Sequence, residues 1–181
     1  MVWLGIVALV FAAEVPLERE LAAVKKTLAS GDRLAAAGAA RDLERAVAVR
    51  APLEVFDGRA LIAPAFGLGM YDPVQGGVVR GDELFLYAQV RNHTTRALAG
   101  GWYEVQLESD LIVLDAAGAE LARDIGFGES RFTARAVHRD TFVNVALRTK
   151  GLATGSYRVR LVVHDKATSR TGEVEIPFAI P

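Results

Sequence analysis

The stretch GLATGSYRVRLVVHD, residues 151–165, decides the fold. Its glycines are typical of a turn. From Tyr157 onward the apolar side chains recur at every second position, at Val159, Leu161 and Val163. A period of two indicates a β-strand with one face on a buried core. We therefore predict a turn followed by a strand from Tyr157 to Val163.

Leu152, Gly155 and Tyr157 form the pattern L-x-x-G-x-Y at the start of this strand. The pattern resembles the tyrosine corner of immunoglobulin-like and fibronectin type III-like sandwiches. The resemblance implies a buried tyrosine ring whose hydroxyl bonds a backbone group a few residues upstream. A buried hydroxyl without a partner costs about 1–3 kcal/mol, so a tyrosine here serves with both its ring and its hydroxyl.

The fold implied by this resemblance is mainly β: an antiparallel immunoglobulin-like or fibronectin type III-like β-sandwich over residues 53–181, preceded by a short helical segment. Two features depart from antibody domains. The chain has no cysteine, and Trp102 follows Gly100-Gly101 at the start of a strand instead of lying in its middle. The chain is similar to the broader bacterial class, including sandwich modules of uncharacterised exported proteins, and that similarity carries no established activity.

Other stretches of residues 53–181 support the sandwich. DELFLYAQVRN, residues 82–92, and GWYEVQLES, residues 101–109, alternate with a period of two, and a glycine-containing turn at residues 116–118 separates two apolar runs. No helical period follows Leu53, which favours an antiparallel sandwich over β-α-β units. Further strands are predicted over residues 53–56, 59–66, 130–137, 141–147 and 173–180.

The segment before the sandwich, residues 13–52, has a helical pattern. Its apolar side chains fall on one stripe at Leu17, Leu21, Val24 and Leu28. Ser30-Gly31-Asp32 predicts the end of one helix and the N-cap of a second, Arg33 to Val49. Pro52 ends the segment. It forms either a hairpin that packs on itself or on the sandwich, or an exposed stalk that pairs with a partner helix.

Residues 2–13 hold no charged side chain. As a helix they would span about 18 Å, against about 30 Å for the hydrocarbon core of a membrane. Val10-Phe11-Ala12 fits the small-x-small rule for signal-peptide cleavage after Ala12, although no Lys or Arg precedes the apolar run. We predict a signal peptide over residues 1–12, export to the periplasm, cell surface or medium, and no membrane span after cleavage. The alternatives are an uncleaved anchor and a buried N-terminal helix.

Composition excludes several function classes. The net charge of −1 and the pI near 6.3 give no basic footprint for nucleic acid. The absence of cysteine excludes disulfides, thiol nucleophiles and cysteine zinc sites. Arg outnumbers Lys by 17 to 4, a bias associated with high-GC bacterial genomes.

The sequence shows no catalytic constellation. His93, His138 and His164 lack metal-ligand spacing, and we expect surface or hairpin positions for them. No serine lies in G-x-S-x-G, and no calcium-loop register surrounds the candidate carboxylates Asp72, Asp110, Asp115 and Asp165. We therefore predict no catalytic residue, no metal and no cofactor, and a protein that is not an enzyme.

Five residues are candidate ligand or partner contacts. Tyr71, Trp102 and Tyr103 would form the stacking platform of a glycan site. Arg131 and Arg135 share one face if their strand is continuous, where they either meet an acidic partner or belong to a solvated surface. Phe66, Met70 and Tyr71 form either a core plug, which we favour, or a ligand-contacting loop.

The function that these observations favour is an exported, non-enzymatic binding or structural module of the bacterial periplasm or cell surface. Its partner would be a protein or another cell-envelope component, held by sandwich-end loops or an exposed edge strand. The alternative is a carbohydrate-binding accessory domain. An exposed aromatic strip would favour a glycan, and a long unprotected edge strand would favour a protein. The sequence does not indicate the oligomeric state.

Overall fold

The structure is a computed structural model that describes residues 17–181. The predicted signal peptide, residues 1–12, lies outside the described residues. The chain divides into two compact units, with the division between Arg50 and Ala51. In the part that is described, no helix combines the length and the apolar character needed to cross a membrane.

The first unit contains two helices that pack against each other, α1 (Leu17–Ala29) and α2 (Arg33–Ala48). Between them Gly31 has a φ of 76°, a left-handed conformation that glycine adopts without a steric penalty. Asp32 is the N-cap of α2, and its Oδ1 accepts a hydrogen bond from the Ala35 N–H at 3.0 Å. The predicted helix boundary at this turn is therefore correct.

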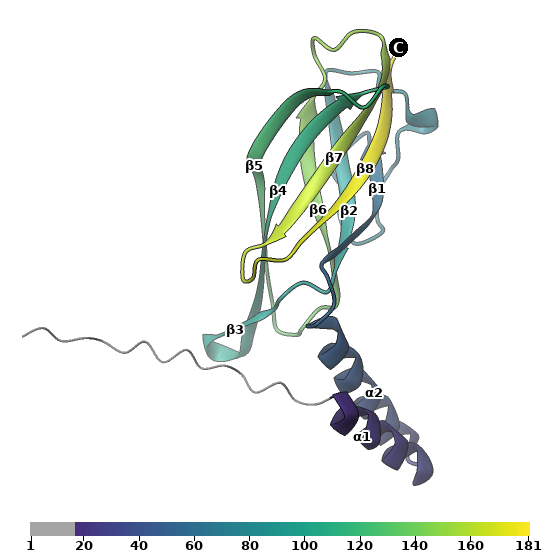
Figure 1. Cartoon of the computed structure of the whole chain (residues 1–181), viewed down its shortest axis with the longest axis vertical. Helices are drawn as coiled ribbons and strands as arrows, with labels where there is room; N and C mark the ends of the chain where they lie inside the picture. The colour runs from purple at the N-terminus through teal and green to yellow at the C-terminus, as the bar shows by residue number, and fades with distance from the viewer. Residues whose placement is uncertain (1–16) are drawn as a thin grey trace, which may run out of the picture. The chain divides into compact units, whose positions relative to one another are not determined.

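The second unit is a sandwich of two antiparallel sheets (Figure 1). The first sheet has the order β1-β2-β6, formed by β1 (Glu54–Leu61), β2 (Glu83–Arg91) and β6 (Asp140–Arg148). The second has the order β5-β4-β7-β8, and the short β3 pairs with the start of β4. Its strands are β3 (Arg96–Leu98), β4 (Trp102–Asp115), β5 (Glu120–Ala134), β7 (Gly155–Asp165) and β8 (Thr171–Ile180). The predicted fold class is confirmed.

The inner faces of both sheets form one hydrophobic core. In β7 the alternating residues Val159, Leu161 and Val163 have no exposed surface. Leu84 and Leu86 of β2 face them from the other sheet and are equally buried. The period of two in the sequence therefore corresponds to the faces that meet in the core.

Tyr157 lies at the start of β7, where the tyrosine corner is expected. Its ring is buried and stacks on Phe178 of β8, with 5.4 Å between ring centroids. Its hydroxyl donates to the carbonyl of Ala153, four residues upstream, at 2.7 Å. Leu152 packs against the main core, and a Cβ at Gly155 would contact the Tyr157 ring at 3.7 Å. The motif thereby ties the turn before β7 to the core.

Two strand boundaries differ from the prediction. Residues 53–56 and 59–66 were expected as separate strands, but β1 is one strand with an irregularity at Asp57, whose φ is 50°. Gly58 is required beside it, because a Cβ there would lie 2.8 Å from Ile176. β5 begins ten residues before the predicted start at Ser130. Its first half is exposed on both faces and so lacks the alternation that marks a half-buried strand.

The long connection between β1 and β2, residues 62–82, packs partly on the outer face of the three-stranded sheet. Tyr71 joins Tyr87 there in a second apolar cluster, with ring centroids 4.6 Å apart. The Gly69 N–H donates to the Tyr87 hydroxyl at 2.8 Å. Phe66 and Met70, by contrast, are exposed. The expected core plug is therefore correct for Tyr71 and wrong for these two residues.

Candidate functional site

The three aromatic residues proposed as a stacking platform lie in different surroundings. The Tyr71 hydroxyl donates to Asp57 Oδ2 at 3.0 Å while its ring packs on Tyr87. Trp102 and Tyr103 are consecutive in β4, so their side chains point to opposite faces of the sheet. The Arg135 guanidinium covers the Trp102 ring at 4.2 Å. These rings do not form a common flat surface.

The two candidate arginines have structural partners. Arg131 and Arg96 flank Glu104 and form ion pairs with it, and Glu104 is only 1% exposed. The hydrogen bond from Arg96 is the main cause of the lowered pKa of Glu104; burial opposes the shift and Arg131 adds to it. β5 ends at Ala134, so Arg135 does not continue the row that Arg131 was expected to begin.

Asp110 is the second buried carboxylate on the outer face of β4. Burial alone would raise its pKa, but hydrogen bonds from the Gly126 N–H at 2.8 Å and from His164 outweigh it and lower the pKa. His164 Nε2 lies 2.7 Å from Asp110 Oδ2. The pair joins β7 to β4, and Gly126 places the irregular part of β5 against the same carboxylate.

A polar network closes the sandwich end that carries the β2–β3 and β7–β8 connections. Asp165 accepts from the Thr94 N–H at 2.8 Å and pairs with Arg170 at 3.2 Å. Burial would raise the pKa of Asp165, and the hydrogen bonds from Thr94 and Ala167, together with Arg170, lower it. The network ties both connections into one unit.

His93 lies beside this network and is buried, which contradicts the expectation of a surface or hairpin position. It is 8% exposed, and neither ring nitrogen has a hydrogen-bond partner among the described residues. Burial is the main cause of its lowered pKa, only partly offset by the nearby Asp165. Sequence reasoning missed this residue because the chain that buries it is remote in sequence.

Within residues 17–181, no group of three or more His, Cys, Asp or Glu side chains is placed to hold a metal ion. Of the candidate carboxylates, Asp110 and Asp165 are engaged as described above. Asp115 accepts from the Ala119 N–H at 2.8 Å in the β4–β5 turn. These groups serve loops and strands of the sandwich itself.

β5 is an edge strand. It pairs with β4 on one side, and no described residue pairs with its other edge. Register irregularities lie opposite Ser109–Leu111 and Val113–Leu114, whereas Gly128–Ala134 pairs residue for residue with β4. Three large apolar side chains of this strand are exposed, by 41–62%: Leu121, Ile125 and Phe127.

A pocket of about 270 Å³ lies beside the regular part of this edge. Phe132 of β5 and Phe142 of β6 contact each other in its wall, with ring centroids 5.9 Å apart. Tyr103 and Val105 of β4 contribute from the inner face of their sheet, and Leu68 contributes from the β1–β2 connection. Thr95 contributes from the β2–β3 connection. The pocket thus lies where the edges of the two sheets face each other, and its walls come from stretches that are far apart in the sequence.

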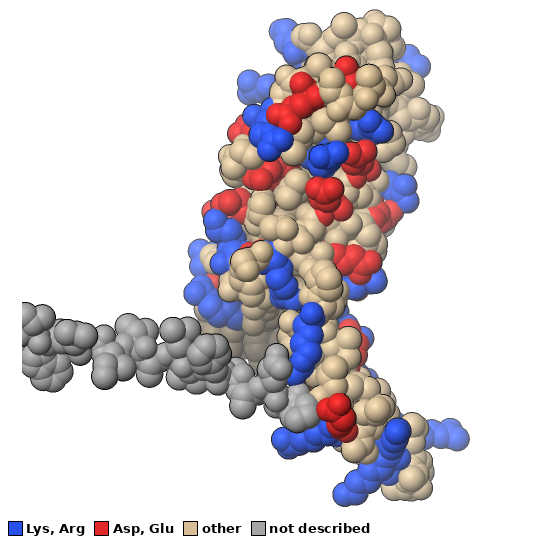
Figure 2. Space-filling view, in the orientation of Figure 1, with Lys and Arg blue, Asp and Glu red and all other residues tan. Residues whose placement is uncertain are grey.

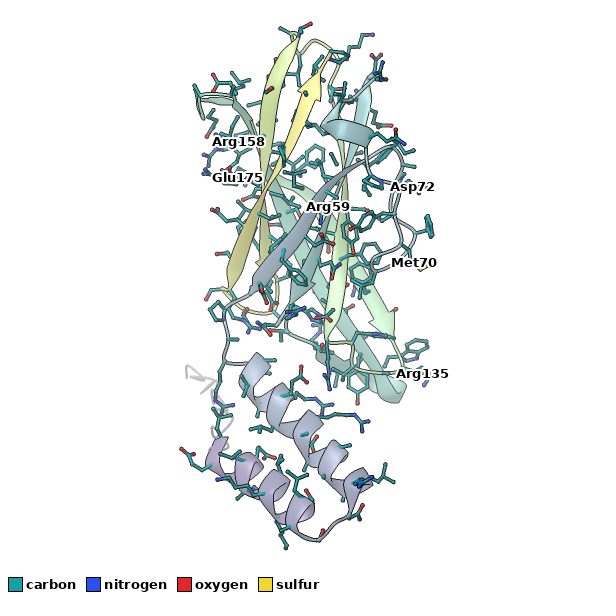
Figure 3. All side chains as sticks on the ribbon, turned by 90° about the vertical axis from the view of Figure 1, so that its right-hand side faces the viewer. Arg59, Met70, Asp72, Arg135, Arg158 and Glu175 are labelled. Atoms are coloured by element: carbon teal, nitrogen blue, oxygen red, sulfur yellow. The ribbon has the colours of Figure 1, made fainter. Side chains whose placement is uncertain are left out.

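Figure 3 shows Met70 and Arg135 on the right-hand side of the sandwich, whereas Arg158 and Glu175 lie toward the left. Arg158 and Arg160 both pair with Glu175 across β7 and β8. In Figure 2, acidic and basic side chains are interspersed over the visible face of the sandwich. On the β7–β8 surface Glu175 is thus paired within the sandwich, whereas the apolar pocket lies on the β5–β6 side.

Comparison with described protein families and with curated proteins gives no match. Among solved structures, the chain is similar to a β-glucuronidase from glycoside hydrolase family 2, with 11% identity and a TM-score of 0.35 over 71% of this chain and 13% of that one. It is also similar to Bifidobacterium dentium β-glucuronidase complexed with coumarin-3-O-glucuronide, with 16% identity and a TM-score of 0.31 over 72% and 18%. The chain thus spans less than a fifth of either enzyme, and these values support no inference about activity or ligand.

Proposed function

We propose that this protein is an exported, non-enzymatic module of the bacterial periplasm or cell surface, and that it binds a protein partner through the edge of β5. The observation that carries the proposal is the regular, one-sided pairing of Gly128–Ala134. A free strand edge presents a row of backbone donors and acceptors that an extended peptide can use.

The protection of the β8 and β1 edges supports this assignment to β5. At the far edge of the same sheet, Val79 donates its N–H to the Ala179 carbonyl of β8 at 2.8 Å. β1 packs against β8 where Leu53 and Val55 approach Gly172, so this side of the sandwich is closed. β5 has no such cover, and exposed Ile125 and Phe127 lie at its middle. β6 also pairs on one side only, but large exposed apolar side chains lie on β5 and none of those in the described residues lies on β6.

The alternative, a carbohydrate-binding accessory domain, has less support. Glycan recognition by stacking needs an exposed aromatic strip. Trp102 is 39% exposed, but the Arg135 guanidinium lies over one face of its ring, and Tyr71 is packed on Tyr87. Of the two features that separate the hypotheses, the long edge strand is present and the aromatic strip is not. A protein partner is therefore the function that we put forward.

Photo-crosslinking in the native host tests the edge. A photoreactive amino acid replaces Glu129 or Thr133, exposed positions on the regular part of β5, and a matched control replaces Ser169 in the β7–β8 turn. We expect one discrete protein adduct from both β5 positions and none from Ser169. Equal labelling at all three positions, or no adduct at β5, would overturn the proposal.

Export is tested separately by expressing the chain with its own N-terminus and measuring the intact mass in each cell fraction. We expect a mature form that begins at Ala13 outside the cytoplasm. Retention of the whole chain in the cytoplasm would contradict the export proposal without affecting the crosslinking result.

A further inference from the structure

The pocket beside β5 is small for a free ligand. Sites for drug-sized molecules usually enclose about 300–1,000 Å³, and this one holds about 270 Å³. Its lining is largely apolar, with the aromatic rings of Tyr103, Phe132 and Phe142 around it. Aromatic rings of this kind favour another ring in a tilted or offset arrangement. The volume and the lining together suit one aromatic side chain.

The position of the pocket relates it to the free edge. Phe132 and Ala134 line it from the regular part of β5, and Ala136 lines it from the following connection. A strand that paired with Gly128–Ala134 would extend the five-stranded sheet toward β6. Because side chains alternate along a strand, every second side chain of that added strand would point to the inner side of the sheet, where the pocket lies.

We propose that the pocket receives a single aromatic side chain of an extended partner segment that pairs with β5 at Gly128–Ala134. This inference rests on the proposed function and names the feature of the partner that gives specificity. Backbone pairing contributes affinity for any extended segment, whereas the pocket selects the residue that faces it.

Charge adds a second feature of the partner. Around the regular part of β5, the three arginines Arg96, Arg131 and Arg135 lie near two carboxylates, Glu104 and Glu129, which leaves one positive charge in excess. The Arg135 guanidinium contacts the Gly100 carbonyl at 2.6 Å and the Trp102 ring, neither of which is charged. We therefore expect acidic residues beside the aromatic anchor, because opposite charges favour the encounter.

A random twelve-residue peptide library displayed on phage, selected against the immobilised full chain, provides the probe. One selected peptide is synthesised in three forms: unmodified, with its aromatic residue changed to alanine, and with alternate backbone nitrogens methylated on the edge that would pair.

Four forms of the protein are compared. They are the natural chain, Ala136→Trp and Ala134→Trp, which fill the pocket, and Ser169→Trp, a matched control in the β7–β8 turn. Circular dichroism establishes that each variant is folded. Ala136 lies in an exposed connection, so Ala136→Trp still tests the pocket if Ala134→Trp does not fold.

We expect selected peptides to share an aromatic residue flanked by acidic ones. Removing the aromatic residue should weaken binding on the order of 30-fold, the value expected for a buried anchor at an interface. Ala136→Trp should weaken peptide binding to a similar extent. Combining Ala136→Trp with the peptide that lacks its aromatic residue should weaken binding little more than either change alone. Ser169→Trp should bind like the natural chain.

The outcomes separate this inference from the proposed function. Peptides that bind without a shared aromatic residue, are unaffected by Ala136→Trp and are weakened by backbone methylation would overturn the pocket inference and leave the β5 edge standing. Binding that depends on the pocket but not on the peptide backbone would overturn edge pairing. A library that yields no specific binder would contradict both.

Discussion

The helical unit and the sandwich bury very different shares of their apolar side chains. In α1 and α2 the only buried residue is Ala36, and Leu34 is 81% exposed. In the sandwich, Leu84, Leu107 and Leu161 have no exposed surface. The two helices have 13 and 16 residues, near the length of about 12–15 residues at which isolated helices are marginal. Amphipathic patterning therefore produced a core in the sandwich, while the helices depend more on local effects such as capping.

The largest expected difference between the two units comes from removing one leucine from each. Leu161→Ala should lower the free energy of unfolding of the sandwich by about 2–5 kcal/mol, because it leaves a cavity in a closed core. Leu34→Ala should change it by no more than about 0.5 kcal/mol, because that side chain is exposed. Urea unfolding of the full chain, followed by far-UV circular dichroism, measures both. Equal losses would show that the helical unit has a core of its own.

Tyr157→Phe tests whether the tyrosine hydroxyl contributes to stability apart from its ring. The substitution keeps the stacking on Phe178 and removes the hydrogen bond to the Ala153 carbonyl. Ala153 is exposed, so water can replace the lost donor, and we expect a loss near the lower end of the range of about 1–3 kcal/mol. Urea unfolding measures the change against Tyr103→Phe, since the structure shows no hydrogen bond from the Tyr103 hydroxyl within residues 17–181. A loss no greater than that of the control would contradict the role of the corner.

The sandwich was predictable where one strand face meets the core and where a local motif sets a turn. The alternation in β2 and β7 and the capping by Asp32 both depend on residues close in sequence. The first half of β5 was missed because neither of its faces is buried, so its sequence has no period to detect. Local pattern therefore identified the strands that have one buried or half-buried face, including the second half of β5, and missed the half of β5 that is exposed on both faces.

The candidate site was harder to predict because its parts come together only in three dimensions. Glu104 is buried because Arg96 and Arg131 reach it from the two neighbouring strands, and nothing in its own strand indicates that. The pocket combines residues from the β1–β2 connection, β4, β5 and β6. Tyr103 was singled out from sequence as part of an exposed platform, and the structure places it in this pocket instead.

Acidification should affect the sandwich through His93. The pKa of His93 is lower in the folded protein than its usual value of about 6.5, so the unfolded chain binds a proton that the folded chain resists. Stability should therefore fall as the pH drops through about 6.5 toward the folded pKa. The carboxylates Glu104, Asp110 and Asp165 have lowered pKa values, so their contributions are lost only at more acidic pH, below about 4.

Urea midpoints measured between pH 7.5 and pH 5 test this expectation. The natural chain should lose stability across this range, and His93→Phe should lose less because it has no group to protonate there. A slope that is identical in the two proteins would show that His93 gains a compensating partner when it is charged. In that case the network around Asp165 and Arg170 would have to rearrange to accept the proton.

The smallest effect is expected in the helical unit, at the N-cap of α2. Asp32→Ala removes the acceptor for the Ala35 N–H and should destabilise the first turn of α2 by about 0.5–1 kcal/mol, whereas Asp32→Asn should retain most of the cap. Amide hydrogen exchange at Ala35 and Ala36 reads this turn directly and does not require the sandwich to unfold. If the alanine variant exchanges faster only in α2, the helices are held by local interactions, as their exposed apolar residues indicate. If exchange in α2 does not change, packing holds the helix in place of its cap, and the contrast in burial between the two units does not translate into a contrast in stability.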